Sequence, residues 1–95
     1  MEHKIVYSAI FEKYIPLRRV ESIHVSRSDT NTTISFRAVL ILSGSSNSIS
    51  LEHPNQRNAK RGYPQQQKEA RRQAIEDMHA IAMDLGIGTG TEDYL

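Results

Sequence analysis

The chain has 95 residues and a formal net charge of +1, and this length fits one domain of modest size. It contains no cysteine, which excludes disulfides, thiolate metal sites and thiol nucleophiles. Because no segment has the length of a membrane span and no signal-peptide pattern opens the chain, we expect a cytoplasmic protein without a membrane partner.

The first half of the chain has the period-two alternation of β-strands. We expect four strands, over residues 4–11, 17–27, 32–42 and 49–53. In the second of them, Val20 is out of phase with the later apolar residues, so we expect a bulge there. The third strand is the strongest, because apolar residues occupy every second position along one face: Ile34, Phe36, Ala38, Leu40 and Leu42.

From Gly62 onward the apolar period changes to 3.6, which predicts an amphipathic helix of about 22 residues. Pro64 suits its first turn, and Gly86 suits the residue just past its end. Its apolar stripe consists of Ala70, Ala74, Ile75, Met78, Ile81, Ala82 and Leu85. Short connections favour antiparallel pairing. We therefore predict an α+β fold, a four-stranded antiparallel meander followed by one long C-terminal helix packed on one sheet face. Residues 1–86 would form a single domain and residues 87–95 a flexible tail.

The sequence does not have the spacing patterns of common catalytic or metal sites. Its four histidines lack the short spacings of metal ligands, and no serine stands in a nucleophile-elbow context. The adjacent acids Glu76 and Asp77 would point about 100° apart on a helix, so they would not converge on one proton. We therefore expect a non-enzymatic protein without a catalytic residue, a cofactor or a metal.

Positive charge is concentrated in residues 57–72, where six bases accompany one acid. This basic segment has a charge of +5, so the remaining 79 residues sum to −4. In the predicted helix the bases lie near the start, whereas Glu76, Asp77 and Asp84 lie in the middle and at the end, which inverts the order that the helix macrodipole favours. Local rules tend to be broken at functional sites, so we interpret the bases as candidate phosphate or anion ligands. They are Arg57, Lys60, Arg61, Lys68, Arg71 and Arg72.

Two residues of the basic segment have alternative interpretations. Arg71 falls inside the apolar stripe by helical angle. Its guanidinium either reaches solvent or an acid such as Glu52, or it projects to the helix start, where free backbone N–H groups favour an anion. Tyr63 either offers a stacking face beside Lys60 and Arg61, or packs over the core at the start of the helix. The sequence leaves both choices open.

Residues 67–74, QKEARRQA, resemble the start of the last helix of double-stranded-RNA-binding domains. The similarity covers under a quarter of the chain, although the order of strands and helix is also similar. It implies that Lys68 and Arg71 contact phosphates across a groove, with Gln67 in place of a base. The first helix of that family is replaced by strands in this chain, so the minor-groove contacts of that helix are missing.

We expect a small binding module that engages a phosphate-bearing ligand, nucleic acid or a nucleotide, through residues 57–72. The alternative is a protein–protein inhibitor or adaptor, of a kind common among phages and mobile elements. Such a protein would use the sheet edge or the basic segment against an acidic protein partner. The second sheet face is more apolar than a one-sided sheet requires, at Val6, Ile10, Val39 and Ile41, and this also predicts a homo-oligomer.

Overall fold

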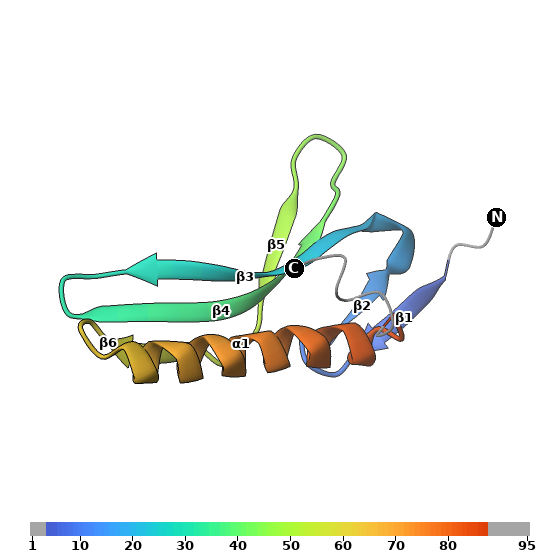
Figure 1. Cartoon of the computed structure of the whole chain (residues 1–95). Helices are drawn as coiled ribbons and strands as arrows, with labels where there is room; N and C mark the ends of the chain where they lie inside the picture. The colour runs from blue at the N-terminus through green and yellow to red at the C-terminus, as the bar shows by residue number, and fades with distance from the viewer. Residues whose placement is uncertain (1–3, 88–95) are drawn as a thin grey trace.

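The computed structural model describes residues 4–87 as an antiparallel sheet, a separate β-hairpin and one long helix (Figure 1). The predicted α+β class is confirmed, because the helix follows the strands and packs on one face of the sheet. In chain order the elements are β1 (Ile5–Ser8), β2 (Lys13–Pro16), the 3-10 turn η1 (Leu17–Arg19), β3 (Val20–Asp29), β4 (Thr33–Leu42), β5 (Ile49–Glu52), β6 (Arg57–Lys60) and α1 (Pro64–Asp84).

The sheet is built around β4, which is antiparallel to every neighbour. It pairs with β3 along one side, and with β5 and then β6 along the other. Four residues separate Glu52 from Arg57, whereas only two separate their partners Val39 and Phe36 on β4. The row formed by β5 and β6 therefore bulges outward around Pro54, where proline cannot donate a ladder hydrogen bond. On the opposite side, β3 is an edge strand of ten residues, in one register from Ser22 to Asp29.

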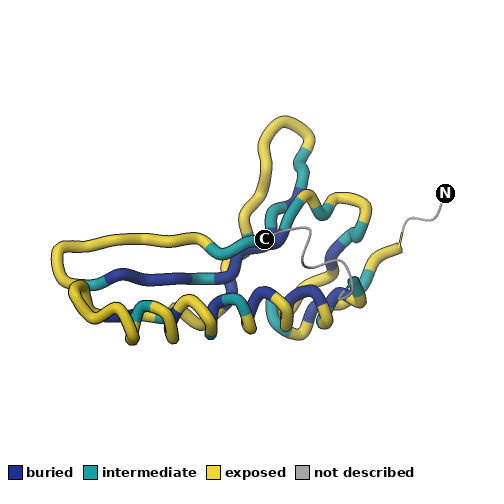
Figure 2. Tube along the Cα trace, viewed as in Figure 1, coloured by how far each residue is buried: buried dark blue, intermediate teal, exposed yellow. Residues whose placement is uncertain are grey.

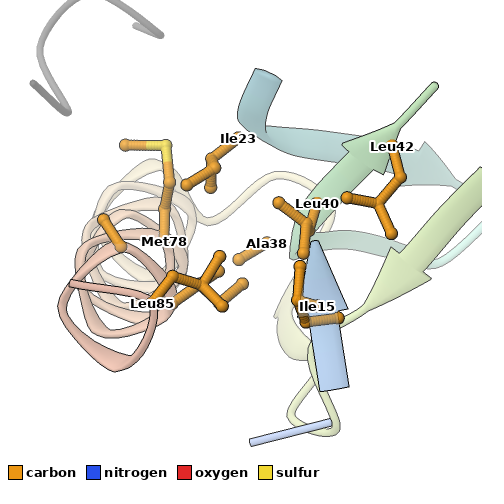
Figure 3. Close-up of a cluster of buried hydrophobic side chains, with 9 residues drawn as sticks. Ile15, Ile23, Ala38, Leu40, Leu42, Met78 and Leu85 are labelled. Carbon is orange, nitrogen blue, oxygen red and sulfur yellow. The ribbon is translucent and has the colours of Figure 1, made fainter. Parts of the chain in front are cut away.

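The core lies between the sheet and α1. The strand residues that alternate toward the helix are buried, and β4 appears as the most deeply covered strand in Figure 2. Ala70 and Ala74 pack close to the β4–β6 end of the sheet, while Met78 and Ile81 join a larger cluster toward the end of the helix (Figure 3). The members of the larger cluster are Ile15, Ile23, Ala38, Leu40, Leu42, Met78, Ile81, Ala82 and Leu85.

The helix ends as its sequence predicts. Gly86 has a φ of 77°, a left-handed conformation that glycine adopts at little cost. Its amide donates to the Met83 carbonyl at 3.0 Å, and the Ile87 amide donates to the Ala82 carbonyl at 2.9 Å. These two bonds satisfy carbonyls that the last turn leaves free, in the pattern of a Schellman motif. The predicted tail, residues 87–95, lies outside the described residues apart from Ile87.

The prediction of one strand over residues 4–11 is wrong. The chain turns after Ser8, passes through Glu12 with a φ of 54°, and returns as β2. This hairpin packs Val6 and Ile15 against the core. Its turn is held by a residue 76 positions away, because the Ser8 hydroxyl donates to Asp84 Oδ2 at 2.5 Å. Local alternation contains no signal of such a contact.

Two further expectations need correction. Arg57–Lys60, predicted as loop, is strand β6; the pattern was missed because Ala59 is its only buried apolar residue. The second predicted strand, residues 17–27, starts at Val20, although the bulge there is confirmed by the register shift between Val20 and Ser22.

The apolar surface expected for self-association is not exposed as predicted. Val39 is buried, Ile41 is half-buried, and Val6 and Ile10 pack against the core. The large apolar side chains that are exposed lie elsewhere, at Ile5, Tyr7, Tyr14, Ile49, Tyr63 and Met83.

Candidate functional site

A groove of about 470 Å³ lies between the edge strand β3 and the first half of α1. It forms because β3 has a neighbouring strand on one side only, so side chains such as Val25 and Ile75 are only partly covered. Its lining combines apolar residues with cations from both walls. The lining residues are His24, Val25, Arg27, Phe36, Pro64, Gln67, Lys68, Arg71 and Ile75.

The acids near the end of α1 are explained by internal partners. The Asp84 carboxylate accepts hydrogen bonds from the Ser8 hydroxyl and, at 3.2 and 3.3 Å, from the amides of Ala9 and Ile10. Asp84 therefore fixes the β1–β2 turn against the helix. Glu76 forms an ion pair with Arg72 one turn earlier. The unfavourable position of these acids in the helix dipole is offset by contacts that stabilise the fold.

Arg57 forms an ion pair with Asp77, the third acid of α1. It approaches Asp77 through Nε and Nη2, both at 2.8 Å, and Asp77 is only 7% exposed. These hydrogen bonds raise the pKa of the Arg57 guanidinium. The bidentate pair joins β6 to the middle of α1 and leaves no open carboxylate beside it. A candidate ligand of the basic segment thus has a structural role.

His53 lies beside this pair, with Nδ1 3.9 Å from Asp77 Oδ2. Its Nδ1 accepts a hydrogen bond from the Asn55 amide at 3.0 Å, so the neutral ring fits the site. Burial lowers the pKa of His53, and the Arg57 and Arg37 charges act in the same direction against Asp77. His53 therefore stabilises the bulge of the β5–β6 row as a neutral residue.

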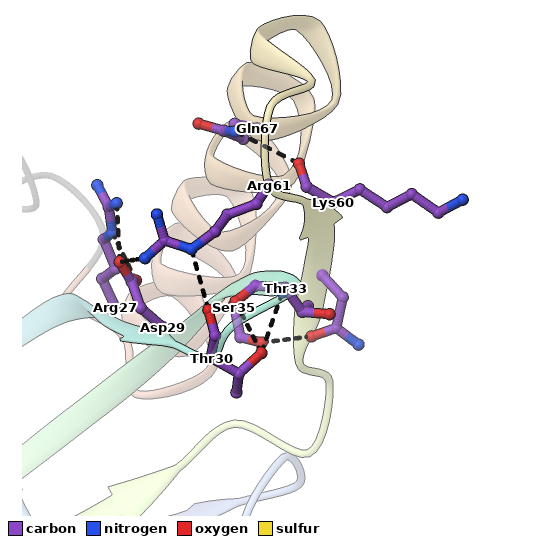
Figure 4. Close-up of polar contacts among 9 residues, drawn as sticks. Arg27, Asp29, Thr30, Thr33, Ser35, Lys60, Arg61 and Gln67 are labelled. Atoms are coloured by element: carbon purple, nitrogen blue, oxygen red, sulfur yellow. Dashed lines mark hydrogen bonds and ion pairs between the residues drawn. The ribbon is translucent and has the colours of Figure 1, made fainter.

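Arg61 is engaged at the other end of the sheet. Its Nε donates to the Thr30 carbonyl at 3.0 Å, and its Nη2 lies 3.1 Å from Asp29 Oδ2 (Figure 4). The Asp29 carboxylate also accepts hydrogen bonds from Arg27 Nε and Nη2 at 2.9 and 3.1 Å, and these hydrogen bonds lower the pKa of Asp29. The two arginines share one acid, so this cluster ties the β3–β4 turn to the loop before α1 and has a net positive charge.

Arg72 points away from the groove and is held on the helix surface. It forms ion pairs with Glu69 and with Glu76, three and four residues away on α1. These contacts raise the pKa of Arg72 and lower that of Glu69. Such exposed pairs contribute little to stability, but they neutralise Arg72 locally.

Lys60 and Tyr63 lie together outside the groove. Lys60 Nζ is 5.9 Å from the centroid of the Tyr63 ring, a cation–π arrangement. The Tyr63 side chain is 53% exposed, so it does not pack over the core at the start of the helix, which was one of its two interpretations. A stacking role for Tyr63 stays a prediction.

Lys68 and Arg71 are different from the other bases of the basic segment. Both are exposed and both line the groove, and neither side chain has a hydrogen bond or an ion pair to another residue within positions 4–87. A spacing of three residues places them on the same side of the helix. The acid suggested as a partner for Arg71, Glu52, instead lies 3.9 Å from Arg37 Nη1.

One groove residue was missed from the sequence. Arg27 lies opposite Lys68 and Arg71, on β3. The signal was present, since Ile23, Val25 and Arg27 alternate onto the helix-facing side of the strand. Arg27 lies 30 positions before the basic segment, so the concentration of charge in residues 57–72 gives no indication of it.

Comparisons with known proteins give no identification. No protein-family model, curated protein or solved structure matches the chain. Within residues 4–87 there is no group of three or more histidines and acids that could hold a metal ion. In the same part of the chain, no helix combines the length and the apolar character needed to cross a membrane.

Proposed function

We propose that this protein is a small non-enzymatic binding domain that holds the phosphate backbone of a nucleic acid through Lys68 and Arg71. The observation that carries the proposal is that these two residues are the bases of α1 without an internal partner among residues 4–87, and that both line one groove. They are also the two residues to which the resemblance to double-stranded-RNA-binding domains assigns phosphate contacts. We take duplex RNA as the first ligand to test.

The surroundings of Lys68 and Arg71 favour an anion. The first turn of α1 has no acid, and Tyr63 at the N-cap makes no side-chain capping bond, so the partial positive charge of the helix start is not neutralised there. Arg27 adds a third cation on the opposite wall, although Asp29 neutralises it in part. A phosphate in the groove would be within the field of all three cations.

The structure lowers the number of phosphate contacts to expect. Arg57, Arg61 and Arg72 are engaged in ion pairs, and Lys60 lies outside the groove beside Tyr63. This leaves Lys68 and Arg71 in the groove, with a smaller contribution from Arg27, which Asp29 neutralises in part. Two or three phosphate contacts give modest affinity and a shallow salt dependence. The partly covered Val25 and Ile75 provide apolar surface against which a sugar or base could pack.

Fluorescence anisotropy with labelled nucleic acids at low salt tests the proposal. The ligands are an RNA duplex of about 16 base pairs, the matching DNA duplex and single-stranded RNA. The variant Lys68→Glu/Arg71→Glu should lower duplex RNA affinity by about a hundredfold, the loss expected for two charge-assisted contacts. The control Lys4→Glu/Lys13→Glu makes the same change of charge at the hairpin and should have a small effect. Equal losses in the two variants would contradict the proposal, as would no binding by the natural chain.

A further inference from the structure

The two edges of the sheet differ in how they are protected. The β5–β6 row is broken into two strands of four residues by a bulge containing Pro54. The β3 edge is ten residues long, and its sequence, VESIHVSRSD, contains neither proline nor lysine. After the register shift between Val20 and Ser22, it keeps one register as far as Asp29. Edge strands without such features are templates for pairing with another chain. Among residues 4–87 nothing pairs with the outer side of β3.

The orientation of β3 determines which of its groups are free. The Thr30 amide donates to the Thr33 carbonyl at 2.8 Å, so Thr30 and Thr33 form a hydrogen-bonded pair at the turn between β3 and β4. In an antiparallel ladder, hydrogen-bonded pairs alternate with pairs whose backbone groups point away from each other. Going back along β3, the even-numbered residues then bond to β4, and the N–H and C=O groups of Ile23, Val25 and Arg27 point outward. The side chains of these three residues lie on the face that α1 covers.

A strand added beside β3 would therefore have a defined pattern. Its residues opposite Ile23, Val25 and Arg27 would place their side chains on the helix side, in the groove. There they would meet Lys68 and Arg71, which lack partners among residues 4–87, so acidic side chains at every second position fit best.

A second copy of the chain is a poor occupant of this edge. Antiparallel pairing of two identical edges about a twofold axis keeps both helices on the same face of the joined sheet. The Arg27, Lys68 and Arg71 side chains of both copies would then line one shared channel, with only Asp29 of each to offset them. Repulsion between these like charges opposes that arrangement, whereas the same positive charge attracts an acidic strand.

We propose that the free edge of β3 accepts an extended acidic segment of a partner protein as an additional antiparallel strand. The backbone of Ile23, Val25 and Arg27 would supply the hydrogen bonds, and Lys68 and Arg71 would select the acids. This inference stands on the free edge and does not depend on nucleic-acid binding.

A displayed library of random peptides, selected on the natural protein, provides the probe. Enriched peptides should carry an acid at every second position and lack proline in their centre. A synthetic peptide from that class should shift the amide resonances of Ile23, Val25 and Arg27. Failure to enrich such a pattern, or shifts confined to other strands, would overturn the proposal.

Two variants of one residue separate the backbone contact from the side chain. Val25→Pro removes an outward amide that makes no bond to β4, and it should weaken peptide binding by about tenfold. Val25→Ala keeps the amide and should weaken binding much less. Equal affinities of the two variants would overturn the proposal. If Val25→Pro fails to fold, peptides N-methylated at alternate positions replace it. Methylation in the phase that faces β3 should abolish binding, and methylation in the other phase should be tolerated; equal effects would overturn the proposal.

The remaining outcomes are also decisive. Nucleic-acid affinity should be the same in Val25→Pro and Val25→Ala, because both remove the apolar side chain that lines the groove. A loss confined to Val25→Pro would assign the free backbone of the edge to nucleic acid and overturn the peptide proposal. Sedimentation that shows a dimer abolished by Val25→Pro would assign the edge to a second copy, with the same consequence. Peptide binding that persists when the RNA experiment fails would support this inference and contradict only the nucleic-acid proposal.

Discussion

Two explanations of Asp84, the acid at the end of α1, predict opposite effects of its replacement by alanine on the stability of the fold. If Asp84 were only a charge at the wrong end of the helix dipole, its removal would stabilise the helix by about 0.3–1 kcal/mol. In the structure, however, its carboxylate accepts hydrogen bonds from the Ser8 hydroxyl and from the amides of Ala9 and Ile10. Its removal should therefore destabilise the fold.

The magnitude follows from the groups left without an acceptor. The Ser8 side chain is buried at 0% exposure, so its hydroxyl cannot turn to water. A hydrogen bond to a charged group contributes about 1.5–3 kcal/mol, and the amides of Ala9 and Ile10 can be partly rehydrated, so the loss should total about 2–3 kcal/mol. The gain from the helix dipole reduces this to about 2 kcal/mol. In a domain of this size that corresponds to a Tm lower by roughly 8–16 °C.

Urea denaturation followed by circular dichroism measures the effect. Asp84→Asn keeps one acceptor oxygen and should lose less than Asp84→Ala. A double-mutant cycle with Ser8→Ala should show a coupling energy, because the two side chains share one bond. Glu76→Ala, which removes an exposed acid from the same helix, should change stability little. An Asp84→Ala protein as stable as the natural chain, or more stable, would refute the reasoning.

Two further predictions concern Arg57 and His53. Arg57→Ala should lower the free energy of unfolding by about 2 kcal/mol, because it leaves the nearly buried Asp77 carboxylate without its bidentate partner, and it should not weaken RNA binding. Urea unfolding measures the stability and fluorescence anisotropy measures the RNA affinity. Unchanged stability together with weaker RNA binding would show that Arg57 is a ligand contact and not a structural residue. Burial lowers the pKa of His53 from its ordinary value of 6.5, so the unfolded chain binds a proton more readily than the folded one. The stability that neutral His53 contributes is therefore present above about pH 6.5 and is lost as the pH falls below it. Urea midpoints at about pH 7.5 and about pH 5.5 should differ less in His53→Gln than in the natural chain; an equal difference would contradict the assignment.

The sequence predicts much of the fold where one periodicity extends over a long segment. The alternation from Ile34 to Leu42 identifies the central strand, and the stripe between Pro64 and Gly86 identifies the helix. Prediction fails where a distant contact decides the local structure. The turn after Ser8 depends on Asp84, and β6 depends on pairing of its backbone with β4, neither of which appears in a local pattern.

The candidate site was predictable only as a set of bases. Charge counting finds residues 57–72 but cannot tell that Arg57 faces Asp77 or that Arg61 faces Asp29, since those acids lie 20 and 32 positions away. The inverted order of charge in α1 is similar. Asp84 and Asp77 are explained by partners far away in the sequence, and Glu76 by Arg72 one turn earlier on the helix. The distant partners of Asp84 and Asp77 are seen only in the structure.

The slope of the logarithm of RNA affinity against the logarithm of salt concentration tests the central claim most directly. Between about 50 and about 200 mM salt, two or three phosphate contacts predict a slope of about −2 to −3 on a B-form DNA scale. The Lys68→Glu/Arg71→Glu variant should bring the slope to between about −1 and zero, since at most the Arg27 contact remains, while Lys4→Glu/Lys13→Glu should leave the slope unchanged. A slope near −5 that persists in the Lys68→Glu/Arg71→Glu variant would show that the ion-paired arginines carry the binding, and would contradict the account.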